Sequence, residues 1–148
     1  KFNETALRQV PADIFEEYKS RLPEPWMKRA LHWYSEQDRV ERSVKAWKEG
    51  DIEEYGRIIF ESGRSSIENY QTGSPELKEI YEIMTRTDGI YGGRFSGAGF
   101  KGCCMAIIDP AYQESILQKV EKEYLAAFPA LKGKYKAAIC HSEEGLAL

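Results

Sequence analysis

The chain has 148 residues, the length of one domain, and its 42% hydrophobic and 30% charged residues are typical of a folded protein with a core. The net charge is −3 and basic residues are interspersed with acidic ones, which argues against nucleic-acid binding through a basic surface. No run approaches the ~18 consecutive apolar residues of a membrane-spanning helix. From the charge we therefore expect no nucleic-acid partner, and from the lack of an apolar run no membrane partner.

Two helices are predicted in the first third of the chain. A short helix covers residues 11–22 and ends at Pro23. A long helix begins near Pro25 and ends at Gly50, since glycine readily takes the left-handed conformation that closes a helix. We expect Trp26 in the core, together with an apolar stripe of the long helix that recurs at helical spacing: Trp33, Val40, Val44 and Trp47.

Two further helices are predicted to begin at capping residues. Asp51 caps the first, and Glu54 three residues later completes a capping-box-like pair. Ser74 followed by Pro75 opens the second, because proline is favoured at the first helical position. Gly63 leaves the middle of the first of these helices small, which would permit close packing against a neighbour.

A glycine-rich segment follows, with apolar residues on both sides. Five of the eleven residues from 92 to 102 are glycine. Residues 103–108 form a short apolar run that stops at Asp109, which predicts a strand rather than a helix. The pattern Gly-x-Gly-x-x-Gly at 97–102 therefore lacks the following helix of a dinucleotide site, and no Gly-Lys-Ser/Thr of a P-loop is present.

The segment is interpreted as a strand–turn–strand whose backbone N–H groups could cradle an anion, typically phosphate. A tight hairpin with no ligand is the alternative, and the polar groups of Arg94 and Ser96 favour anion contact. Arg94 could instead pair with an acid of a helix, and Lys101 could reach a phosphate or an acidic sugar or point into water.

The last part of the chain predicts one helix and one strand. Asp109 and Pro110 repeat the cap-and-proline start of a helix that ends at Pro129, with an inward face of Tyr112, Ile116, Val120 and Tyr124. Residues 134–141 have the composition of a final strand. The order of elements predicts an α+β fold with an antiparallel sheet packed against helices.

The three cysteines do not predict a disulfide framework, because the number is odd and Cys103 and Cys104 are adjacent. Both are expected to be small buried hydrophobic side chains of a strand. No Cys-x-x-Cys or histidine cluster predicts a metal site, and reduced thiols favour a cytoplasmic location. The chain starts at Lys1 without a methionine or a signal peptide, so we expect it to be part of a longer polypeptide.

These segments resemble the GHMP kinases. Residues 93–103 are similar to the third motif of that family, most of all in its galactokinase branch, and residues 74–77 resemble its Ser/Cys-Pro-Glu-Leu string. Residues 32–40 and 50–62 resemble the preceding helices, in the same order. The resemblance implies that residues 1–148 form a ferredoxin-like GHMP kinase C-terminal domain, and that an N-terminal ATP-binding domain completes the protein.

The resemblance implies an ATP-dependent sugar-1-kinase that uses Mg²⁺. The metal ligands and catalytic residues would lie in the N-terminal domain, so this chain would supply none of them and would be inactive alone. Arg94 and Lys101 are candidate contacts to phosphate or to an acidic sugar. The loop residues expected close to ATP or substrate are Ser96, Gly97, Ala98, Gly99 and Gly102.

Galactose is the first substrate that the resemblance suggests, and galacturonate is the second. Lys101 stands where the galactokinase branch commonly has glycine, and Cys103-Cys104 look more like galacturonokinase-type relatives. A third hypothesis is a sugar-sensing regulator without turnover, which the loss of the N-terminal catalytic aspartate and arginine would indicate. The expected partners are ATP, a small-molecule sugar and the N-terminal domain of the same chain.

Overall fold

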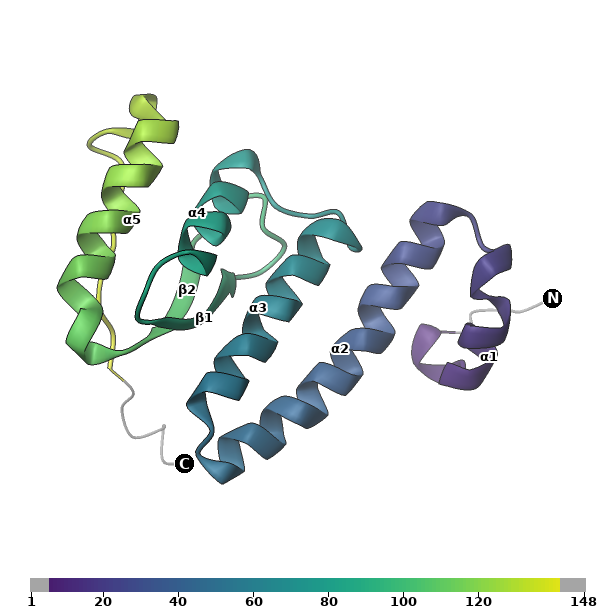
Figure 1. Ribbon diagram of the computed structural model, residues 1–148. Helices are drawn as coiled ribbons and strands as arrows, with labels where there is room; N and C mark the ends of the chain where they lie inside the picture. The colour runs from purple at the N-terminus through teal and green to yellow at the C-terminus, as the bar shows by residue number, and fades with distance from the viewer. Residues whose placement is uncertain (1–5, 142–148) are drawn as a thin grey trace, which may run out of the picture.

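Five α-helices and a two-stranded antiparallel sheet make up the part of the chain that the computed structural model describes, residues 6–141 (Figure 1). Short 3-10 turns flank α1 and α5. In chain order the elements are α1 (Ala12–Tyr18), α2 (Glu24–Glu49), α3 (Ile52–Glu68), α4 (Pro75–Thr85), β1 (Ile90–Phe95), β2 (Cys104–Ile108) and α5 (Gln113–Ala127).

The elements follow one another across the molecule. The long helix α2 lies beside α3, which packs on β1 with its other side. Helix α4 also packs on β1, and α5 packs on α4 at the end of the molecule opposite α1 (Figure 1). This arrangement confirms the predicted α+β fold with an antiparallel sheet against helices, and it brings the β1–β2 hairpin between α3 and α4.

Three of the predicted helix boundaries are confirmed by their capping geometry. Gly50 closes α2 with a φ of 71°. The Asp51 carboxylate accepts a 3.0 Å hydrogen bond from the Glu54 backbone N–H at the start of α3. The Ser74 hydroxyl accepts from the Leu77 backbone N–H at the start of α4, over 3.4 Å. Side-chain acceptors satisfy N–H groups that a helix leaves without a partner at its first turn.

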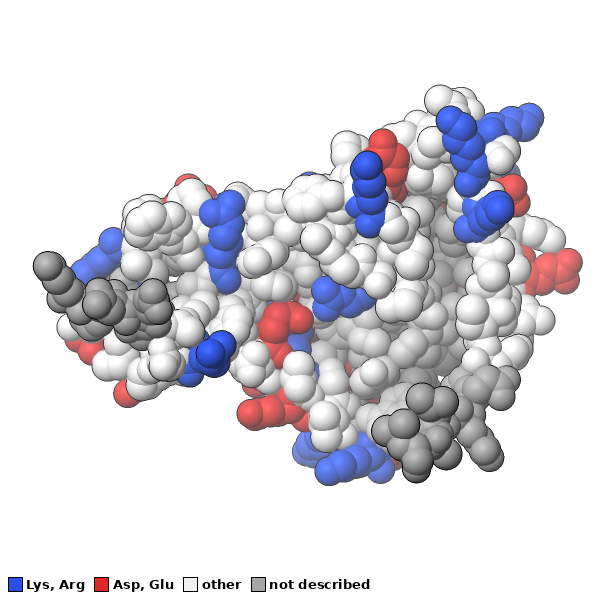
Figure 2. All heavy atoms as spheres, turned by 180° about the vertical axis from the view of Figure 1, so that it is seen from behind, with Lys and Arg blue, Asp and Glu red and all other residues white. Residues whose placement is uncertain are grey.

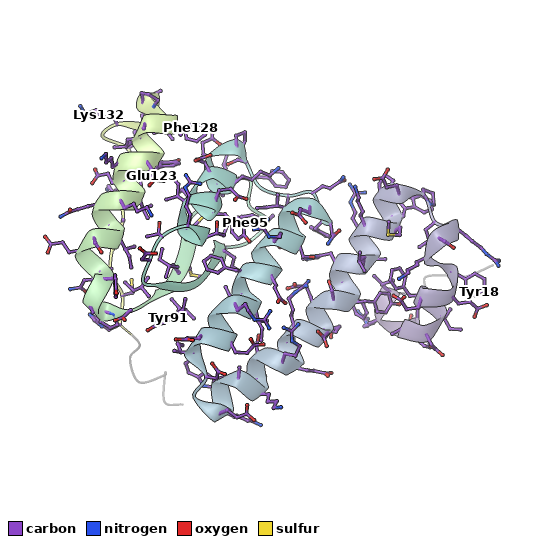
Figure 3. The ribbon with its side chains drawn as sticks, in the orientation of Figure 1. Tyr18, Tyr91, Phe95, Glu123, Phe128 and Lys132 are labelled. Atoms are coloured by element: carbon purple, nitrogen blue, oxygen red, sulfur yellow. The ribbon has the colours of Figure 1, made fainter. Side chains whose placement is uncertain are left out.

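The core lies where α3 and α4 cover β1. Tyr81 is fully buried, and its hydroxyl donates a 2.7 Å hydrogen bond to the Phe60 carbonyl oxygen of α3. Phe95, at the end of β1, lies between α3 and α4 (Figure 3). A Cβ at Gly63 would lie 2.5 Å from the Tyr81 ring, which confirms the predicted close packing at this glycine. A second cluster joins α4 to α5 through Ile83, Ile116, Val120 and Tyr124.

The prediction for the apolar stripe of α2 is wrong. Exposed fractions are 58% for Val40, 49% for Val44 and 64% for Trp47, and Trp26 is 65% exposed. Trp33 is half-buried. The helix instead buries Ala30, Arg39 and Ala46, because the tight contact with α3 admits short side chains and a paired arginine. Trp26, Val40, Val44 and Trp47 are therefore largely open to solvent.

The predicted strand at residues 134–141 is also wrong. After a turn these residues follow an irregular path, and Tyr135 packs against Tyr124 with 5.5 Å between ring centroids. Residues with a high strand propensity form a strand only where a neighbouring strand pairs with their backbone. Tyr112 is exposed rather than inward-facing, because it belongs to the 3-10 turn that precedes α5.

Within residues 6–141, no helix combines the length and apolar composition needed to cross a membrane. The same residues hold no group of three histidine, cysteine or carboxylate side chains that could bind a metal ion. On the face opposite to that of Figure 1, basic and acidic side chains are interspersed (Figure 2). The glycine hairpin is therefore the candidate functional site of these residues.

Candidate functional site

The candidate site is the loop that joins β1 to β2. The two strands are paired up to Phe95 and Cys104, and the Ser96 N–H donates a 2.9 Å hydrogen bond to the Cys103 carbonyl oxygen. Three glycines then take positive φ, a region that side chains with a Cβ disfavour. These glycines are Gly97 at 70°, Gly99 at 76° and Gly102 at 126°.

One half of the loop is anchored and the other is open. Gly99 is buried, and a Cβ there would lie 2.5 Å from the Phe95 ring and 3.0 Å from the Gly73 Cα atom. Its carbonyl oxygen accepts a 2.6 Å hydrogen bond from the Ser74 N–H at the start of α4. Gly97 is exposed, and a Cβ there would meet no atom within 4 Å. The loop therefore offers an open backbone turn held on a fixed base.

The structure brings the predicted loop residues together at this turn. Ser96 is half-buried at the end of β1, whereas Ala98 and Gly102 are exposed. Lys101 is exposed and forms no ion pair with the residues that the structure describes. Its ammonium is therefore available to an anion placed over the loop.

Arg94 points away from the loop, toward α2 and α3. Its Nη1 donates to the Ser62 hydroxyl and lies 3.6 Å from a carboxylate oxygen of Glu36. This contact is the pairing with a helix acid that the sequence offered as the alternative to a phosphate contact. In this arrangement Arg94 ties β1, two residues before Ser96, to the helices behind it.

Glu36 is the centre of a polar network that sequence reasoning did not single out. Its carboxylate accepts 2.8 Å and 2.6 Å hydrogen bonds from the Ser62 hydroxyl and the Arg39 Nε. Arg39 also donates to the Ser35 hydroxyl over 2.7 Å. The signal was present, because Glu36, Arg39 and Ser62 all lie in segments that carry the family resemblance. The network joins α2, α3 and β1.

His32 extends this network along α2. Its Nδ1 lies 2.9 Å from the Ser65 hydroxyl of α3. Burial lowers the pKa of His32; the positive charges of Arg39 and Arg94 lower it further, and the Glu36 carboxylate opposes them. The imidazole is therefore held in its neutral form near neutral pH.

The two adjacent cysteines have different surroundings. Cys103 is exposed, against the prediction that both are buried, because it lies in the loop just before β2 begins. Cys104 is half-buried, and burial raises the pKa of its thiol to about 12. The Cys104 thiol therefore stays protonated and is a poor nucleophile, since the thiolate is the reactive form.

A groove of about 500 Å³ lies on the α2–α3 face, next to the polar network. Its apolar walls are Val40, Val44 and Trp47 of α2 with Tyr55, Ile58 and Ile59 of α3. Glu36, Arg39, Ser62 and Arg94 also line it. Of the residues that line the groove, Arg94 belongs to β1 and lies two residues before Ser96, where the loop begins.

The sequence and the fold of this chain are similar to those of known proteins. The family described as GHMP kinases C terminal matches residues 43–126. A galacturonokinase of Arabidopsis thaliana is 41% identical over 143 residues, which cover 94% of this chain and 34% of that protein. A galactokinase of Clostridium perfringens is 31% identical over 138 residues, covering 93% of this chain and 36% of that protein.

A crystal structure of Lactococcus lactis galactokinase complexed with galactose has the same fold, with a TM-score of 0.78 and 24% identity. The match covers 86% of this chain and 33% of that one. The chain thus spans about a third of the length of these relatives. Since the family match extends over more than half of its residues, the chain belongs to the GHMP kinases, as a C-terminal domain of that family.

Proposed function

We propose that the chain is the C-terminal domain of an ATP-dependent kinase that phosphorylates the anomeric hydroxyl of a galactose-type sugar. The observation that carries this proposal is the glycine hairpin, which presents an open turn on an anchored base within a GHMP kinase domain. Phosphoryl transfer depends mainly on positioning and on stabilising charge, which such a turn can serve. ATP, Mg²⁺ ligands and catalytic residues would belong to an N-terminal domain, and the enzyme would act in the cytoplasm.

The loop would lie beside the nucleotide phosphates and the sugar. Its backbone N–H groups are suited to phosphate oxygens, because side chains are small or missing at the turn and the backbone is accessible. The residues proposed to lie close to ATP or substrate are Ser96, Gly97, Ala98, Gly99 and Gly102; of these, Gly97, Ala98 and Gly102 are exposed, whereas Gly99 is buried and anchors the loop. Arg94 holds β1 in place through Glu36 and is a positioning residue rather than a phosphate ligand.

The favoured sugar is galacturonate, with galactose second. Identity is 41% with the galacturonokinase and 31% with the galactokinase, which reverses the order that the sequence suggested. Lys101 supports the same order, because its exposed ammonium on the loop could pair with a uronic-acid carboxylate. A sugar sensor without turnover stays the alternative of another class.

The test is ADP release by the full-length protein with Mg-ATP and each of galacturonate, galactose, glucuronate, arabinose, fucose and glucose. Turnover with galacturonate supports the proposal, and turnover with galactose alone selects the galactokinase alternative. Binding of ATP and a sugar without turnover would indicate the sensor instead.

A further inference from the structure

The connection between α3 and α4, residues 69–74, holds two residues at positive φ. Gly73 has a φ of 98°, and Gln71, at 61°, is the one residue other than glycine with a positive φ in the part of the chain that the structure describes. Residues with a Cβ rarely adopt this region, and strained backbone persists only where surrounding contacts fix it. Thr72 supplies such contacts, because it is buried and both its N–H and its hydroxyl donate 3.1 Å hydrogen bonds to the Ser66 carbonyl oxygen of α3.

This fixed connection packs directly against the glycine loop. The Ser74 N–H donates its 2.6 Å hydrogen bond to the Gly99 carbonyl oxygen. A Cβ at Gly73 would lie 3.2 Å from the Phe95 ring, and a Cβ at Gly99 would lie 2.5 Å from the same ring and 3.0 Å from the Gly73 Cα atom. Phe95 is buried, and a close-packed interior leaves such a ring little room to move. The position of the loop therefore depends on the backbone at Gly73.

The first turn of α4 holds the other strand of the hairpin as well. The Cys104 Sγ lies 3.7 Å from the Leu77 carbonyl oxygen, to which its thiol donates. Cys104 is the first residue of β2 and Phe95 is the last residue of β1. Both sides of the base of the loop thus contact the start of α4, where the chain arrives through the strained connection.

We propose that Gly73, which lies outside the loop, is a positioning residue of the kinase and sets where the backbone N–H groups of residues 96–99 stand. The proposal rests on the proposed function in one respect, that these groups lie beside the nucleotide phosphates. An alanine at this position would be strained at a φ of 98° and would press on the Phe95 ring. Either effect shifts the Ser74 N–H or Gly99, and a displacement of about 1 Å can cost a catalyst about a hundredfold in rate.

The experiment measures kcat/KM for ATP in the full-length protein carrying Gly73→Ala. The matched control is Gly133→Ala, because Gly133 has a φ of 81° but a Cβ there would meet no atom within 4 Å. We expect Gly73→Ala to lower kcat/KM about tenfold or more while circular dichroism shows a folded protein at the assay temperature. Gly133→Ala should keep the kcat/KM of the parent protein. A folded Gly73→Ala with unchanged kcat/KM, or an equal loss in both variants, would overturn the proposal.

Hydrogen exchange of the unsubstituted full-length protein provides a second measurement that needs no variant. If the loop binds nucleotide through the contact described, saturating Mg-ATP should slow exchange of the Ser74 amide, because two coupled sites stabilise each other reciprocally. Exchange at Ser74 that is unaffected by bound nucleotide would contradict the proposal.

The two measurements also separate this inference from the proposed function. Slower Ser74 exchange with Mg-ATP in a protein that turns over no sugar would support the inference and count against the proposed kinase. Sugar turnover with an unchanged kcat/KM in folded Gly73→Ala would do the reverse. A protein that neither binds Mg-ATP nor turns over a sugar would overturn both.

Discussion

At Gly92 the backbone of β1 touches the backbone of α3. A Cβ at Gly92 would lie 2.2 Å from the carbonyl oxygen of Gly56, and a Cβ at Gly56 would lie 2.2 Å from that of Tyr91. We expect Gly92→Ala to lower the free energy of unfolding by about 3 kcal/mol, because neither backbone can move without disturbing the core. The control is Gly50→Ala, which meets no atom within 4 Å but has a φ of 71°.

Gly50→Ala should lower the free energy of unfolding by about 1 kcal/mol, because alanine is strained in the left-handed backbone conformation. Urea denaturation of both variants measures the two free energies. Equal losses would mean that crowding between α3 and β1 contributes nothing beyond backbone conformation.

The half-buried imidazole of His32 predicts a pH dependence of stability. Its pKa is lowered in the folded protein, principally by burial, while Glu36, Arg39 and Arg94 are the charged groups around it. The unfolded chain therefore takes up a proton first, and stability falls as the pH is lowered through about 6.5, the ordinary histidine pKa. We expect His32→Gln to flatten the dependence of the denaturation midpoint on pH between neutrality and mild acidity. An unchanged slope in that variant would assign the effect to other groups.

Lys101 carries the prediction for substrate choice. If its ammonium pairs with a uronic-acid carboxylate, Lys101→Gly should raise the KM for galacturonate about tenfold or more, the effect of losing one charge-assisted hydrogen bond. The KM for ATP should stay the same. Lys132→Gly, an exposed lysine after α5, serves as the control (Figure 3). A variant with unchanged kinetics toward galacturonate would remove Lys101 from the sugar site.

At the scale of elements, α2, α3 and β1 are joined through Glu36. We expect Glu36→Ala to lower the free energy of unfolding by about 2 kcal/mol, because it leaves Arg39, Ser62 and Arg94 without their shared acceptor in a half-buried place. Glu16→Ala removes the exposed ion pair with Lys19 and should cost about 0.5 kcal/mol or less. Thermal denaturation compares the two; similar losses would show that the network adds no more than a surface pair.

Helix boundaries were predictable because local chemistry sets them. Gly50, Asp51 and Ser74 act on backbone groups within a few residues, and each lies where the sequence suggested. The outward face of α2 was not predictable in the same way. Periodicity shows that a helix has an apolar face, but it does not show whether the neighbour that covers it lies in the same domain. The strand predicted at residues 134–141 is absent, because a strand also needs a partner strand that lies far away in the sequence.

The candidate site was predicted in part. The hairpin and its positive-φ glycines follow from composition, since several clustered glycines predict a sharp turn. Gly99 is attached to the start of α4 by a hydrogen bond from Ser74, which is 25 positions away in the sequence. No local sequence pattern indicates this contact. The side of β1 on which Arg94 lies was left open by the sequence and required the packing of α3.

At the scale of the whole molecule, the isolated 148-residue chain should be inactive. No catalytic residue is expected in it, and the loop offers backbone contacts without a general base or metal ligands in the proposed mechanism. Incubation of the purified chain with Mg-ATP and galacturonate or galactose should release no ADP above background. ADP release that depends on the sugar would show that the catalytic groups lie within these residues after all.

All three tryptophans of the chain, Trp26, Trp33 and Trp47, lie on α2, and two of them are largely open to solvent. Tryptophan emission from this domain is therefore a spectroscopic report on one helix, and it is nearly blind to the hairpin, α4 and α5. The domain alone should emit at the long wavelengths of hydrated indole. In a larger assembly, a shift to shorter wavelength that disappears in Trp47→Phe would give an optical signal of what happens on the surface of α2.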